Sequence, residues 1–165
     1  MDTSREYALM CKNATLEIQN KKLPISGFCN FETGDVFLHT IDGGIFLLVE
    51  GELKPKIEET IWLPRLDQLI ELYSNTMFSR NPKHKITILC DNMRNLVETY
   101  NSSGARKGIF DSFEKLFLDF FMRQFSKKRW CPELGEWLRE DEHLMLIEGK
   151  YMKSVIGNET QFSGM

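Results

Sequence analysis

The sequence lacks any run of apolar residues long enough to cross a membrane, and its first residues are polar. A membrane-spanning helix needs about 18 or more consecutive apolar residues, and a secretory leader needs a shorter apolar core close to its start. Neither pattern is present. The sequence therefore predicts a cytoplasmic protein that has no membrane partner.

Cysteine is scarce, and its occurrences lie far apart in the chain, at Cys11, Cys29, Cys90 and Cys131. No two of them form a C-x-x-C pair, and no histidine lies at the spacing that a zinc site requires. The pattern is typical of free thiols in a reducing compartment. We therefore expect neither a metal site nor any other cofactor.

Neither sign of charge dominates, because 21 lysines and arginines face 24 acids for a formal net charge of −3. A domain that binds nucleic acid usually concentrates positive charge on one face. The segment 127–130, Lys-Lys-Arg-Trp, does combine cations with an aromatic ring. Cations at the end of a helix also stabilise its dipole, so a nucleic-acid partner is not expected.

The sequence has no recognisable catalytic centre. His39, His84 and His143 are scattered, and no serine or cysteine lies in the context of a hydrolase nucleophile. The segment 148–150, Glu-Gly-Lys, resembles half of a metal-dependent nuclease site, but the second acid is missing and a solvated turn is the simpler explanation. We therefore expect a protein that is not an enzyme, with a nuclease as the third alternative.

Apolar and aromatic side chains, in contrast, are abundant, at 42% and 12% of the 165 residues. A chain of this length and composition can bury a core without disulfides, so residues 1–165 are expected to form a single domain with a polar tail from about residue 157. The local patterns predict an α+β fold, with a small antiparallel sheet packed with about four helices.

Apolar residues at helical spacing predict the helices. Thr3 with Glu6 forms a capping box for the first. Asp111 with Glu114 forms another, ahead of a stripe of phenylalanines that should be the spine of the core. The expected helices span about residues 3–18, 64–75, 91–100 and 111–125.

Glycines and β-branched residues predict the strands. The turn Asp42-Gly43-Gly44 lies between the apolar segments 36–41 and 45–49, which is typical of a β-hairpin. The short apolar run 86–90 fits a buried strand, with Asp91 as the cap of the helix that follows. A last strand is expected at residues 143–147.

The first binding hypothesis concerns a protein partner. Trp62, Trp130 and Trp137 stand beside polar turns, and exposed aromatic residues often anchor protein interfaces. They predict an interaction surface, unless these tryptophans belong to the core.

The second binding hypothesis concerns a small molecule, such as a phosphorylated nucleotide. Arg106 and Lys107 lie in the glycine-bounded segment 104–108 just before a strong helix, where an anion can bind. Tyr100 or an exposed tryptophan would then stack on the base. The glycine spacing is not that of a Walker A loop, so a plain linker is the alternative.

The segment 61–69, Ile-Trp-Leu-Pro-Arg-Leu-Asp-Gln-Leu, resembles one found in small uncharacterised proteins of phages and prophages in Gram-positive bacteria. The likeness continues in Gly34-Asp35, in 112–116 and in Glu136-Trp137, and so touches most of residues 5–138. The stretch 76–108 looks like extra material relative to shorter members of this family.

The resemblance brings no catalytic residues with it. Small phage accessory proteins commonly act by binding, so the resemblance implies a protein that occludes a host or defence protein in the host cytoplasm. Sequestering a small signalling molecule is the alternative that it also implies.

Overall fold

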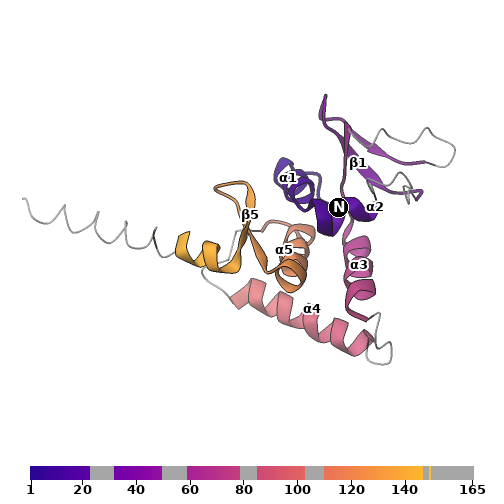
Figure 1. Ribbon diagram of the computed structural model, residues 1–165. Helices are drawn as coiled ribbons and strands as arrows, with labels where there is room; N and C mark the ends of the chain where they lie inside the picture. The colour runs from indigo at the N-terminus through magenta and orange to yellow at the C-terminus, as the bar shows by residue number, and fades with distance from the viewer. Residues whose placement is uncertain (23–31, 50–58, 79–84, 103–109, 147–148, 150–165) are drawn as a thin grey trace, which may run out of the picture.

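The computed structural model describes residues 1–22, 32–49, 59–78, 85–102, 110–146 and 149. It shows the predicted α+β fold, in which helices pack with a three-stranded and a two-stranded antiparallel sheet (Figure 1). The elements are α1 Arg5–Asn13, the π-helix η1 Thr15–Gln19, α2 Asn20–Lys22, β1 Val36–His39, β2 Ile45–Leu47, β3 Thr60–Trp62, α3 Leu66–Phe78, α4 Lys85–Ser102, α5 Phe113–Ser126, β4 Lys128–Cys131 and β5 Glu136–Arg139.

The first helical region buries the face that its sequence predicts. Every member of the expected apolar stripe is fully buried: Tyr7, Met10, Cys11, Ala14 and Ile18. The capping box at Thr3 is wrong by one residue, because Ser4 has the extended backbone of an N-cap and its hydroxyl accepts from the Tyr7 N–H at 3.2 Å.

The predicted β-hairpin is confirmed. β1 pairs with β2 in antiparallel register, with Phe37 opposite Phe46, and the tight turn depends on the positive φ of Gly43, +72°. β3 pairs with the other side of β1, which gives the sheet the order β2-β1-β3. β4 and β5 form the second sheet.

Two strand predictions are wrong. The run 86–90 lies inside α4, where Ile88 is exposed and Asp91 is a mid-helix residue rather than a cap. Periodicity alone cannot separate a short buried strand from a helix segment, and a strand here would have needed burial on both faces. Residues 143–146 likewise lie in a helical stretch, so the last strands come earlier, as β4 and β5.

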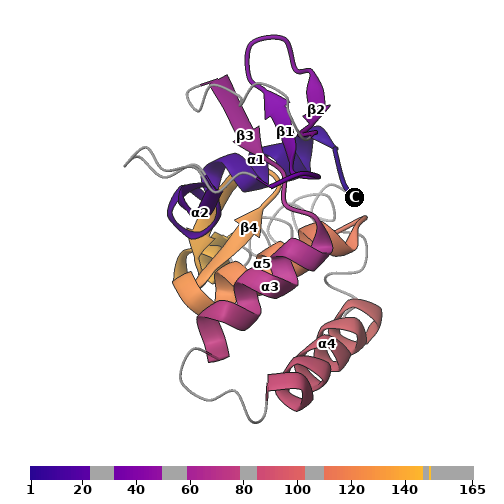
Figure 2. The ribbon, with the colours of Figure 1, turned by 90° about the vertical axis from the view of Figure 1, so that its right-hand side faces the viewer.

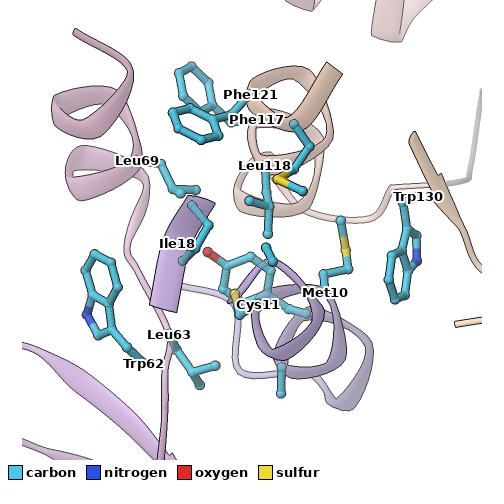
Figure 3. Close-up of a cluster of buried hydrophobic side chains, with 14 of the residues drawn as sticks. Met10, Cys11, Ile18, Trp62, Leu63, Leu69, Phe117, Leu118, Phe121 and Trp130 are labelled. Atoms are coloured by element: carbon cyan, nitrogen blue, oxygen red, sulfur yellow. The ribbon is translucent and has the colours of Figure 1, made fainter. Parts of the chain in front are cut away.

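α5 is the spine of the core, as predicted. Its apolar face contacts α3 through Tyr73, whose ring packs edge-on against Phe117 at 5.9 Å. Figure 3 shows Phe117 and Phe121 pointing from α5 toward α3, near Leu69, and Leu118 pointing toward Met10 and Cys11. Phe113 departs from the predicted stripe, because it is exposed in the first turn of the helix.

A buried lysine fastens α1 to α5. Lys115 Nζ lies 2.8 Å from Glu6 Oε2 and 2.6 Å from Asp111 Oδ1, while Glu6 also accepts from the Trp130 Nε1–H at 3.2 Å. Asp111 therefore pairs with Lys115 instead of capping α5, a role that Ser112 takes. A buried charge that is paired in this way is a structural element, since it is costly to leave unpaired.

Candidate functional site

The predicted tryptophan surface is not exposed. Trp62 is 1% exposed and Trp130 is 3% exposed, so both rings belong to the core (Figure 3). Trp137 is half-buried, packs edge-on against Trp130 at 5.2 Å and donates its indole N–H to the Met10 carbonyl. The prediction of an interface here is therefore corrected, because these rings are buried within the fold.

The cations of the predicted anion site do not belong to the residues that the structure describes. Arg106 and Lys107 fall in the undescribed range 103–109, and Tyr100 is placed only by its backbone, near the end of α4. Glu148 and Lys150 of the nuclease alternative are also outside the described residues. These hypotheses stay predictions.

The basic segment after α5 has internal partners. Lys127 forms the left-handed C-cap of the helix, with φ +55°. Lys128 Nζ lies 3.5 Å from Glu17 Oε1, and Arg129 Nη2 lies 3.4 Å from Asp119 Oδ2. The fold itself thus explains why cations stand at these positions.

The titratable side chains of the described residues do not assemble a reactive group. Both ring nitrogens of His39 face carboxylates, Asp42 at 2.8 Å and Glu59 at 3.5 Å, and the hydrogen bond to Asp42 raises the pKa of the imidazole. Cys11 and Cys131 are buried free thiols whose pKa values burial raises, so neither is an activated nucleophile. Within the described ranges no three His, Cys, Asp or Glu side chains gather as metal ligands.

The outer edge of β2 is open. The hydrogen bonds from Leu48 N to Asp35 O and from His39 N to Gly44 O, at 2.8 and 2.7 Å, show which residues of this strand face β1. Because inward and outward residues alternate in an antiparallel pair, the backbone groups of Ile45 and Leu47 point away from the sheet. No described residue pairs with them, and Figure 2 shows β2 on the outside of the sheet.

Apolar side chains accompany these outward backbone groups. Ile45 is 47% exposed and Leu47 is 52% exposed, and both lie on the same face of the sheet because side chains alternate along a strand. Val49 continues the row and is exposed too. We call Ile45, Leu47 and Val49 the open edge.

A groove lies beside the open edge, between α1 and the hairpin. Its volume is about 540 Å³, and it shares Ile45 with the edge. Its other lining residues are Thr3, Arg5, Ala8, Leu9 and Lys12 of the N-terminal region, and Leu38, His39, Thr40, Gly43 and Ile61 of the sheet. We call this hollow the α1–β2 groove.

The opposite edge of the sheet is closed at Trp62. The side-chain amide of Gln19 accepts from the Trp62 N–H at 2.9 Å and donates to the Trp62 carbonyl at 2.9 Å. It also donates to the Cys11 carbonyl, and Gln19 is only 8% exposed. The amide thus occupies the positions that a neighbouring strand would use.

Sequence reasoning missed both Gln19 and the open edge, although one signal was present. The run 45–49, Ile-Phe-Leu-Leu-Val, is apolar at every position, which is typical of a strand buried on both faces. A small sheet can bury the side chains on only one face of such a hairpin strand, so the apolar side chains on the other face stay exposed. The pattern therefore predicts an exposed apolar face.

Comparison of the chain with protein-family models, with curated proteins and with solved structures gives no match. Among the described residues, no helix is both long and apolar enough to span a membrane. We therefore infer a function from the open edge and the α1–β2 groove.

Proposed function

We propose that this protein acts by binding another protein, which adds a β-strand to the open edge of β2. The observation that carries the proposal is an edge strand whose outward backbone groups have no described partner and whose side chains Ile45 and Leu47 are about half exposed. Main-chain hydrogen bonds would supply affinity, and the alternate side chains would supply selectivity.

The composition of β2 supports this role. Sheet edges are usually protected by a lysine, a proline, a bulge or a covering segment, because an unprotected edge pairs with other chains. β2, Ile45–Leu47, carries neither a charge nor a proline, and the side chains of Ile45 and Leu47 are exposed. An edge of this kind, which no described residue covers, favours a surface that has a partner.

The partner fits the class that the sequence resemblance implies. Small phage accessory proteins commonly act by occluding a host or defence protein, and strand addition requires only one exposed edge on each side. We propose such a protein as the partner. Catalysis forms no part of the proposal.

The test compares two lysine substitutions in the hairpin. Leu47→Lys places a charge in the open edge, whereas Ile41→Lys adds the same charge at an exposed hairpin position outside it. Affinity purification from host cells identifies partners of the unchanged protein, and calorimetry with each purified partner then measures binding. We expect Leu47→Lys to weaken binding at least about a hundredfold, since an unpaired charge in an interface costs several kcal/mol.

Ile41→Lys should bind like the unchanged protein, and circular dichroism should show that both variants fold. A partner that binds Leu47→Lys with undiminished affinity would refute strand addition at β2.

A further inference from the structure

The α1 wall of the groove carries two cations that have no acidic partner among the described residues. Arg5 and Lys12 both line the α1–β2 groove, on the same side of the helix as Leu9 because residues four and seven apart share a face. Both are exposed, and in the described ranges neither lies within 4 Å of a carboxylate. Arg123 and Arg139, by contrast, each pair with an acid, at 3.0 and 3.2 Å.

No acid is found among the described residues that line the groove. Its floor is apolar, formed by Ala8, Leu38 and Ile61, and its remaining polar side chains are two threonines and His39. Both ring nitrogens of His39 face carboxylates, Asp42 at 2.8 Å and Glu59 at 3.5 Å, so the positive character of the hollow comes from Arg5 and Lys12. The whole chain is negative by three charges, so this groove is a local exception to the net charge.

We propose that the segment bound at the open edge is an extended acidic and apolar peptide of the partner protein. Its apolar side chains would pack beside Ile45 and Leu47, and one or more carboxylates on the same face would reach Arg5 and Lys12. This inference rests on the proposed strand addition and adds the chemistry of the partner. Charge complementarity selects this occupant, since the described lining of the groove carries Arg5 and Lys12 and no acid.

The probe is a library of random peptides of about ten residues, the upper length of most strands, displayed on yeast. Selection uses the full-length protein, and a parallel selection uses Leu47→Pro. Proline at this position removes a backbone N–H that points outward, so the ladder with β1 keeps its hydrogen bonds. We expect the enriched peptides to combine β-branched or aromatic residues with Asp or Glu, and to be lost with Leu47→Pro.

The cations are then tested directly with an enriched synthetic peptide. The double variant Arg5→Gln, Lys12→Gln should weaken its Kd about fivefold to tenfold, as expected for two exposed ion pairs, and should flatten the dependence of Kd on salt. Lys21→Gln removes an exposed cation that does not line the groove, so it should leave the Kd unchanged. Fluorescence anisotropy at low and high salt measures both quantities.

The outcomes separate the two proposals. Peptides that need an intact Leu47 but carry no excess of acids, or that bind the double variant equally well, would overturn the acidic partner and leave strand addition standing. Failure to enrich any peptide, or equal binding to Leu47→Pro, would overturn both. A stable dimer of the unchanged protein that Leu47→Lys dissociates, seen by sedimentation, would show that a second copy occupies the edge and would also overturn the acidic partner.

Discussion

The two outer edges of the three-stranded sheet differ in how their backbone groups are satisfied. At β3, the buried amide of Gln19 pairs with both the N–H and the carbonyl of Trp62. At β2, the outward groups of Ile45 and Leu47 meet no described residue, and the side chains beside them are half exposed. The outward backbone groups of β3 at Trp62 are therefore hydrogen-bonded within the core. Those of β2, which meet no described residue, can pair with the strand of another protein.

The difference shows that closing an edge does not require another strand. An amide side chain presents the same donor and acceptor as a peptide group, so one glutamine can replace a strand partner at one residue. Figure 2 shows α1 beside the sheet, and Gln19 at the end of η1 reaches Trp62 of β3 through its side chain. β2 has no such element among the described residues.

Removing the closure at β3 should have the largest effect. Gln19→Leu leaves the Trp62 N–H, the Trp62 carbonyl and the Cys11 carbonyl without that partner in a buried site. We expect the free energy of unfolding, measured by urea denaturation, to fall by about 3 kcal/mol. Leu16→Gln, at an exposed position of the same short helix, is the control and should change it by less than about 0.5 kcal/mol. A loss under about 1 kcal/mol for Gln19→Leu would mean that the edge is not closed by this side chain.

The second prediction contrasts neighbouring residues of β2. Phe46 points inward and stacks on Phe37, with ring centroids 5.5 Å apart, whereas Leu47 points to solvent. Phe46→Ala should lower the free energy of unfolding by about 2 kcal/mol, and Leu47→Ala by less than about 0.5 kcal/mol. Partner binding should respond in the reverse way, being lost in Leu47→Ala and retained by folded Phe46→Ala. Equal stability losses would show that Leu47 is part of the core.

Much of the fold could be predicted from the sequence, because it depends on local patterns. The stripe from Tyr7 to Ile18, the glycine turn at Gly43 and the phenylalanine-rich α5 all follow from periodicity and turn chemistry. The predicted strand 86–90 is part of a helix instead, because an apolar segment that short fits a strand or a helix equally well.

The candidate site could not be predicted in the same way. Gln19 follows Ile18 and would ordinarily face solvent, and its pairing with Trp62, 43 residues along the chain, has no local signal. Trp62 and Trp130 were candidates for a surface because the amino-acid type alone does not separate a buried indole from an interface anchor. The edge itself depends on the strand order, which only tertiary structure defines.

The smallest predicted effect concerns the turn that holds β2 against β1. The carboxylate of Asp42 accepts from the Gly44 N–H and pairs with His39, which raises the pKa of the imidazole and lowers that of the carboxyl. A histidine whose pKa is raised on folding stabilises the native state below its ordinary pKa of about 6.5, and this stabilisation is lost as the pH rises through the folded value.

Thermal denaturation between about pH 5.5 and 8.5 measures this contribution, because the unfolded pKa of histidine lies inside that range. The unchanged protein should lose a little stability as the pH rises, and His39→Gln should flatten that dependence. Asp42→Asn keeps an acceptor for Gly44 but removes the charge, so it should flatten most of the pH dependence, while Glu59 maintains the rest. If only His39→Gln had an effect, another carboxylate, such as Glu59 at 3.5 Å, would be the partner that matters, and the Asp42 pair would not be what fixes the turn beside the open edge.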